Sequence, residues 1–274
     1  MPSFLYNMSK KKKQKLTWQT GVAEWWSKYM PPARPSKSEL KIFEDYIEKA
    51  PKQGEILILG CTPELRDLVL KYQRRPVSAD LNPKNFSALK KLMKYQGRER
   101  FIQGNWLKLK EKNKFDLVIG HLSFNMLPFS NWDRLIRIIY RSLRPKGKLI
   151  HAVSVRYPKD RCKNILDIFK GYRRKRSRGH IYYEIGNDLV LAICDIRRNY
   201  ADFEILGRKL NNLYKSQKIT KEEYRGIIDV QVSRALKLTL PLKTRIDSLF
   251  KKYFSGVRIV PNLKPSVSLP ANTS

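Results

Sequence analysis

The chain has 274 residues, 42% of them hydrophobic, and carries 57 Lys and Arg against 24 Asp and Glu, a formal net charge of +33. This length and apolar content exclude a disordered chain and predict one substantial core with a smaller addition. No apolar run approaches the ~20 residues that cross a bilayer, and no apolar stretch follows the basic N-terminus, so we expect neither a membrane anchor nor a signal peptide.

The three cysteines, Cys61, Cys162 and Cys194, stand far apart and form no CxxC pair. This spacing favours neither a disulfide framework nor a zinc site, so we expect a metal-free protein of the reducing cytoplasm. The positive charge favours a polyanionic partner such as RNA, DNA or a ribosome. The alternative is a basic composition common to the source proteome, because the excess charge is spread along the chain.

The first 50 residues are expected to precede the core. Residues 1–15 include the Lys10–Lys13 run and predict a flexible basic arm. Residues 16–50 predict a helical segment, with aromatic residues at helical spacing up to residue 30. A second helix is expected to follow, for which Ser38 is a candidate N-cap.

A regular alternation of strands and helices follows in residues 51–155. Strands that are apolar on both faces, separated by amphipathic helices, imply a parallel sheet with helices on both sides. The sequence therefore predicts a doubly wound α/β domain with a mostly parallel sheet. The expected strands are 55–60, 76–80, 100–104, 114–120 and 147–155, and the expected helices are 64–73, 83–96 and 131–143.

Residues 156–274 predict a mainly helical region that covers the substrate. Six basic residues lie between Lys170 and Arg178, with Tyr172, Tyr182 and Tyr183 close by. Helices are expected over 201–217, 220–236 and 242–254, and residues 256–261 are a candidate strand at the sheet edge.

Gly60 ends the first strand, at the turn where open α/β sheets usually bind their ligand. A pyrophosphate needs the GxGxxG pattern, which is absent here, and the Glu64 carboxylate at the helix start would repel a phosphate. Asp80 ends the second strand and is placed to accept hydrogen bonds from both ribose hydroxyls. The pair favours a ligand with an adenosine and an amino-acid tail, although a purely structural role for both residues is the alternative.

Five blocks of sequence, "ILILGCTPE", "VSADLN", "FIQGNW", "FDLVIGHLSF" and "LRPKGKLI", occur in the order found in a known family. Over roughly residues 38–155 the chain resembles the class I S-adenosylmethionine (SAM)-dependent methyltransferases, most specifically in "KFDLVIG" and "LRPKGKLI". The resemblance implies a Rossmann-like, seven-stranded sheet, with SAM lying across the ends of the first three strands.

The resemblance also implies roles for individual residues. Asp80 would bind the ribose, and Arg34 would meet the SAM carboxylate if the N-terminal segment forms a lid. The remaining positions would face the methionine part (Gly60, Cys61, Thr62, Glu64), the adenine (Leu81, Asn105, Trp106) and the sulfonium (Gly120, His121). Two departures are the single glycine in the first turn and Asn105 where the family often has an acid.

His121 is the candidate catalytic residue, because it is the titratable group at the end of the fourth strand. An imidazole there is able to act as a general base or to orient the acceptor, and a routine hydrogen bond is the alternative. Asn125 is a weaker candidate for orienting the acceptor, and His151 is expected to be structural. No Asn or Asp followed by Pro-Pro and an aromatic residue follows this strand, and neither does a cysteine, which disfavours methylation of base amino groups and of cytosine C5.

Three functions are therefore consistent with the sequence. A methyltransferase acting on RNA would grip the backbone with Lys10–Lys13 and the loop from Lys170 to Arg178. A methyltransferase acting on a small molecule would use the region after Val155 as a substrate cover. A methyltransferase-like protein without catalysis would serve as a nucleic-acid-binding module. We favour a methyltransferase whose acceptor the sequence does not assign.

Overall fold

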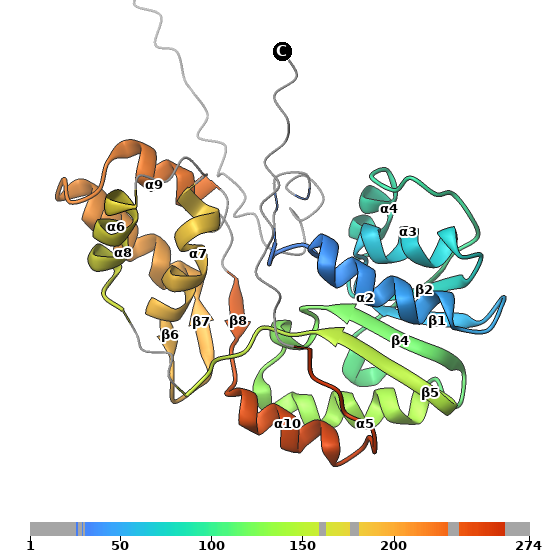
Figure 1. Ribbon diagram of the computed structural model, residues 1–274. Coiled ribbons are helices and arrows are strands. Elements are labelled where there is room, and N and C mark those ends of the chain that lie inside the picture. Colours follow the sequence, from blue (N-terminus) through green and yellow to red (C-terminus); the bar gives the residue numbers. More distant parts are fainter. Residues whose placement is uncertain are drawn as a thin grey trace, which may run out of the picture.

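The computed structural model describes residues 26, 29, 31–158, 163–175, 181–229 and 236–260 (Figure 1). The predicted basic arm, most of the helix expected before residue 30, Cys162 and the end of the basic loop lie outside these residues. None of the described helices is long and apolar enough to cross a bilayer.

The core is a five-stranded parallel sheet in the order β3-β2-β1-β4-β5. The predicted α/β class is confirmed, and each predicted core strand is present. The strands are β1 (Glu55–Leu59), β2 (Arg75–Asp80), β3 (Arg100–Gln103), β4 (Phe115–His121) and β5 (Leu143–Ala152).

The expectation of seven strands is wrong for the described part of the chain. After β5 the chain leaves the sheet, and the later strands pair with one another in a separate antiparallel sheet of order β6-β7-β8. Residues 256–260, a candidate edge strand, form no strand. The later strands are β6 (Cys194–Asp195), β7 (Tyr200–Asp202) and β8 (Lys237–Thr239).

Helices cover both faces of the core sheet (Figure 1). On one face lie α2 (Lys37–Glu48) and α3 (Pro63–Lys71). They pack against the β1 and β4 side chains Ile56, Ile58, Leu117 and Ile119. On the other face, α5 (Trp132–Ser142) and α10 (Lys243–Lys251) bury Trp132 and Ile246 against the sheet. Because both faces are covered, the strands are apolar on both sides, as the sequence pattern required.

Two helices of the core differ from the sequence analysis at their boundaries. The N-cap of α2 is Ser36 rather than Ser38, because Ser36 and Glu39 form a reciprocal capping box. The helix α4 (Pro83–Lys90), capped by Asn82, is also shorter than expected.

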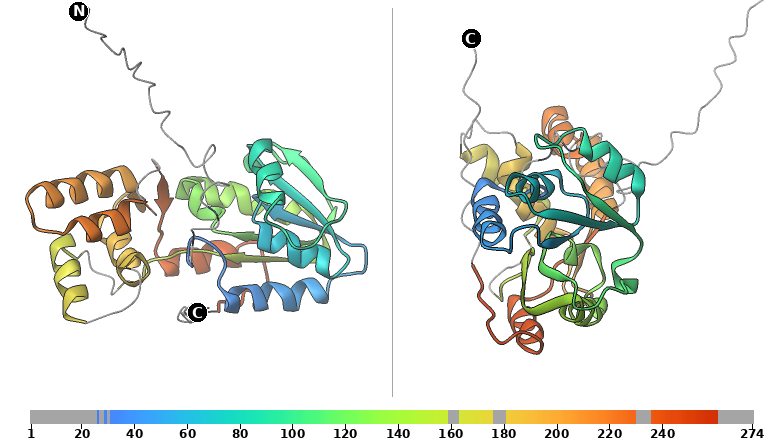
Figure 2. Two further views of the ribbon diagram at one scale, coloured as in Figure 1. Left: turned by 90° about the horizontal axis from the view of Figure 1, so that it is seen from above. Right: turned by 90° about the vertical axis from the view of Figure 1, so that its right-hand side faces the viewer.

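The region after β5 has a hydrophobic core of its own, and Figure 2 shows it beside the core sheet. Its helices are α6 (Ile165–Arg174), α7 (Ile181–Ala192), α8 (Phe203–Lys215) and α9 (Lys221–Ile227). The helix α9 lies in the first part of the helix predicted over 220–236, of which residues 230–235 lie outside the described residues. The predicted helix over 242–254 corresponds to α10, which returns to the core sheet.

Candidate functional site

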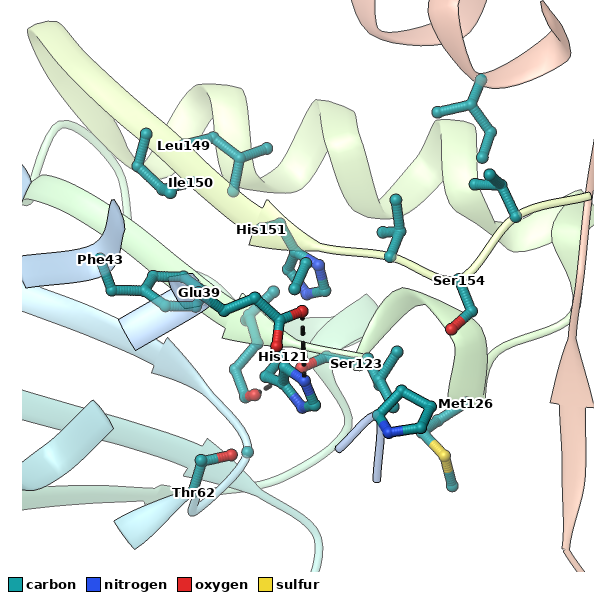
Figure 3. A pocket seen from close by; sticks show the side chains of 18 of the residues that line it. Glu39, Phe43, Thr62, His121, Ser123, Met126, Leu149, Ile150, His151 and Ser154 are labelled. Carbon is teal, nitrogen blue, oxygen red and sulfur yellow. Dashed lines mark hydrogen bonds and ion pairs between the residues drawn. The ribbon is translucent and has the colours of Figure 1, made fainter. Parts of the chain in front are cut away.

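A cavity of about 1010 Å³ opens at the carboxyl ends of the core strands and extends along β5 towards the helical region. Its walls come from α2, from the turns after β1 and β2, from the end of β4, and from residues after β5 (Figure 3). Of the residues predicted for the site, Gly60, Cys61, Thr62, Asp80, Trp106 and His121 line this cavity.

Gly60 and Asp80 lie side by side at the edge of the cavity. Gly60 has φ +102°, and a Cβ built on it would lie 3.9 Å from Asp80 Oδ2. Gly60 N–H donates to Ala79 O at 2.8 Å, which ties the turn after β1 to β2. A side chain at Gly60 would be strained in this backbone region and would stand beside the carboxylate.

Asp80 is a carboxylate held by backbone donors. Asp80 Oδ1 accepts from Asn82 N–H at 3.0 Å. Burial raises the pKa of Asp80, and hydrogen bonds from the Asn82 and Leu81 backbone partly oppose this change. Burial likewise raises the pKa of the Cys61 thiol, with the Asp80 carboxylate adding to the effect, so Cys61 is no thiolate nucleophile at neutral pH.

The predicted adenine side is formed by residues after β2 and β3. Leu81 is exposed, and Trp106 donates from Nε1 to Ala79 O, which fixes the indole beside β2. Asn105 Oδ1 accepts from Leu107 N–H at 2.9 Å and so caps a short 3-10 turn at Trp106–Lys108. Neither Leu81 nor Asn105 lines the cavity.

The predicted methionine side contains an ion pair that the sequence did not suggest. Glu64 Oε1, in the first turn of α3, accepts from Arg34 Nη2 and from Trp26 Nε1. Trp26 and Tyr29 are buried against Cys61 and Leu89. Trp26 and Tyr29 therefore pack over the turn after β1, and Arg34 lies beside them through its contact with Glu64.

We expect Arg34→Ala to lower the free energy of unfolding by no more than about 1 kcal/mol, because the Arg34 side chain is 32% exposed and such pairs contribute little. Urea denaturation of the two proteins measures this. A loss above about 2 kcal/mol would show that Arg34 holds the N-terminal segment in place.

His121 ends β4 with a side chain that is only 2% exposed, and its Nε2 lies 3.9 Å from Glu39 Oε1 of α2. Figure 3 labels Glu39, His121 and His151 among the side chains that line the cavity, and a dashed line joins Glu39 to His121. Burial lowers the pKa of His121 to about 4, and the Glu39 carboxylate opposes this. Burial, and then the nearby His121, lower the pKa of His151 to about 3. Both imidazoles are therefore neutral at pH 7.

Gly120 lies next to both histidines, because it precedes His121 in β4 and pairs with His151 of β5. A Cβ built on Gly120 would lie 2.5 Å from His151 Nε2. Gly120 therefore makes room for the His151 ring rather than lining the cavity.

Asn125 has a structural role instead of binding an acceptor. Its Nδ2 donates to Ser154 O at 2.7 Å and to Thr239 O at 2.6 Å, and its Oδ1 accepts from Ser154 N–H. These bonds join the turn after β4 to the end of β5 and to β8.

The sequence analysis did not identify two residues at this site. One is Glu39, whose position in the sequence is typical of a capping residue, and the other is Ser123, whose hydroxyl donates to Leu59 O at 2.6 Å.

Comparisons with known proteins place this cavity in a wider context. Residues 56–147 match the sequence model of a family described as "Methyltransferase domain". No curated protein matches the chain significantly. Two solved structures share its fold. One is a Rhodobacter sphaeroides protein provisionally named a Zn-dependent alcohol dehydrogenase, with 15% identity, 85% of this chain and 84% of that chain covered, and a TM-score of 0.56. The other is the PH0226 protein of Pyrococcus horikoshii, with 19% identity, 84% and 89% covered, and a TM-score of 0.51.

A third solved structure is less similar overall. The 1,6-didemethyltoxoflavin-N1-methyltransferase of Burkholderia thailandensis, with bound S-adenosylhomocysteine (SAH), is 17% identical, with 44% of this chain and 52% of that chain covered and a TM-score of 0.37.

Proposed function

We propose that this chain, whose residues 56–147 match a methyltransferase domain family, transfers the methyl group of SAM to an acceptor bound beside His121. The observation that carries the proposal is the Asp80 carboxylate next to the bare backbone of Gly60, at the edge of a cavity that continues to the end of β4.

The residues at this edge suit SAM better than a nucleotide phosphate. Asp80 has a carboxylate whose remaining lone pairs can accept ribose hydroxyls, and Gly60 presents no side chain to block them. Glu64 occupies the start of α3, where a phosphate would otherwise bind. When bound, SAM supplies an electrophilic methyl group on a sulfonium, and the protein orients the acceptor and excludes water.

We expect Asp80→Asn to weaken SAH binding about 10- to 100-fold, because hydrogen bonds to a charged acceptor contribute ~1.5–3 kcal/mol. Isothermal titration calorimetry measures the affinity. Asp45→Asn, at a half-exposed position of α2 outside the cavity wall, is the matched control and should bind SAH like the wild type. Unchanged affinity in Asp80→Asn would remove Asp80 from the site.

The pH dependence of binding provides a second test of Asp80. Protonation removes the negative charge that the ribose hydroxyls would contact, and burial raises the pKa of this carboxyl. SAH affinity should therefore fall on acidification at a higher pH than an ordinary aspartate would give. Asp80→Asn should lack this fall, and an identical pH profile in both proteins would contradict the assignment.

Activity is tested by incubating the protein with radiolabelled SAM and with RNA, protein and organic-soluble fractions of a cell extract. RNA is the second candidate acceptor, favoured by the net charge of +33. Label in any fraction supports a methyltransferase. SAH binding without transfer would support a non-catalytic protein of this fold.

A further inference from the structure

Beyond Gly60 the cavity wall carries a polar group of three side chains, Glu39, His121 and His151. We propose that this polar group receives a hydroxyl group of a compact, largely apolar acceptor, and that the hydroxyl proton passes to His121. The inference rests on the proposed function, because it names the acceptor class for the same site.

The geometry leaves the imidazoles of this polar group short of hydrogen-bond partners. His121 Nε2 and both ring nitrogens of His151 make no hydrogen bond within the described residues, although each is buried. The charged group that acts on His121 is Glu39, from α2, and His121 in turn acts on His151, from β5. Buried polar atoms normally have partners, so unpaired imidazoles on a cavity wall indicate a ligand that supplies a hydrogen-bond donor.

Glu39 is held in place by its second role. Glu39 Oε2 accepts from the backbone N–H and the hydroxyl of Ser36 at 2.7 and 2.8 Å. The other oxygen, Oε1, faces His121. A positive charge that forms on His121 would therefore meet a fixed carboxylate.

The cavity wall outside this polar group is mainly apolar. Residues of α2, of β5 and the chain that follows it, and of the helical region contribute side chains that would contact the body of an acceptor. They include Phe43, Met126, Ile150, Val155, Val190 and Leu240. Such a wall favours an apolar molecule over a phosphodiester backbone.

The proton balance selects a hydroxyl acceptor. An oxygen lone pair forms the bond to the methyl carbon, and the carbon–sulfur pair leaves with the sulfur. The oxygen then carries a positive charge and is far more acidic than an imidazolium, so its proton passes to His121 and afterwards to water. A methylated alkylamine is a weaker acid than an imidazolium, so an alkylamine would gain nothing from this base.

The chemical nature of the product tests the inference. The protein is incubated with methyl-labelled SAM and the three cell fractions, and the labelled product is heated with hydriodic acid, which cleaves methyl ethers and esters to volatile methyl iodide far more readily than N-methyl groups. We expect the label in the organic-soluble fraction and its release as methyl iodide. Label in RNA or protein, or an organic product that retains its label, would overturn the inference and leave a methyltransferase.

Two variants test the roles of the residues. His121→Gln should lower kcat by about 100-fold or more, as loss of a general base does, with SAH affinity within twofold of wild type. Glu39→Gln, which can preserve the capping box, should lower kcat less and change the pH profile of kcat. Wild-type kcat in His121→Gln would overturn the inference.

SAH binding distinguishes the two levels of failure. A protein that binds no SAH would refute both the proposed function and this inference. A protein that binds SAH but labels no fraction would refute methyl transfer and the inference with it, whereas SAH binding with label only in RNA or protein would overturn the inference alone. Asp45→Asn is the control and should keep wild-type kcat.

Discussion

Replacing Arg66 with alanine is expected to lower the free energy of unfolding by about 3–5 kcal/mol, as breaking a buried salt bridge does. Arg66 is fully buried on α3, and its Nε and Nη2 donate to Glu99 at 2.6 and 2.9 Å. Its Nη1 donates to Phe86 O, and its guanidinium lies 4.2 Å from the Phe86 ring centroid. Among the described residues, alanine would leave the Glu99 carboxylate, 2% exposed, with Lys90 at 3.7 Å as its remaining ion-pair partner.

The same change should weaken SAH binding. Arg66 joins α3, which begins just after Gly60, to the chain before β3, so both sides of the predicted adenosine site depend on it. Urea denaturation and calorimetry measure the two effects. The control is the double variant Arg66→Met and Glu99→Leu, which removes both charges and should recover much of the stability. A loss below about 1 kcal/mol in Arg66→Ala would contradict this account.

The core of the fold was predictable because its signals are local. Each core strand is a short apolar run bounded by a turn residue, and burial on both faces requires that pattern. The arrangement of the strands after residue 155 was not predictable. The pairing of β6, β7 and β8 with one another depends on contacts across the helical region. Hydrophobic periodicity carries no information on which sheet a short strand joins.

The site was predictable in the same uneven way. Gly60 and Asp80 each end a strand, and parallel strands place their carboxyl ends together. Glu39 was missed because its sequence context is that of a capping residue, and its approach to His121 comes from α2 packing on the sheet. The pairing of Arg34 with Glu64 likewise depends on where the N-terminal segment packs.

Acidification from pH 6.5 to about 4 is expected to destabilise the protein strongly through His121 and His151. In the unfolded chain both take up a proton near pH 6.5, whereas burial lowers their folded pKa values to about 4 and about 3. The unfolded state therefore binds more protons in this range, and stability falls as pH falls. The free energy of unfolding should decrease by roughly 2–4 kcal/mol per histidine, at ~1.4 kcal/mol per pKa unit.

Urea denaturation at pH 7, 5.5 and 4.5 measures this fall, and His121→Gln and His151→Gln provide the matched controls. Each variant should flatten the pH dependence, because glutamine takes up no proton, and the double variant should lose most of it. An equally steep fall in the double variant would assign acid sensitivity to other groups. Keeping two buried imidazoles neutral and without hydrogen bonds lowers the stability of the protein. Buried polar side chains normally have hydrogen-bond partners, and the hydroxyl of a bound acceptor would provide one, which is why we connect these histidines with an acceptor.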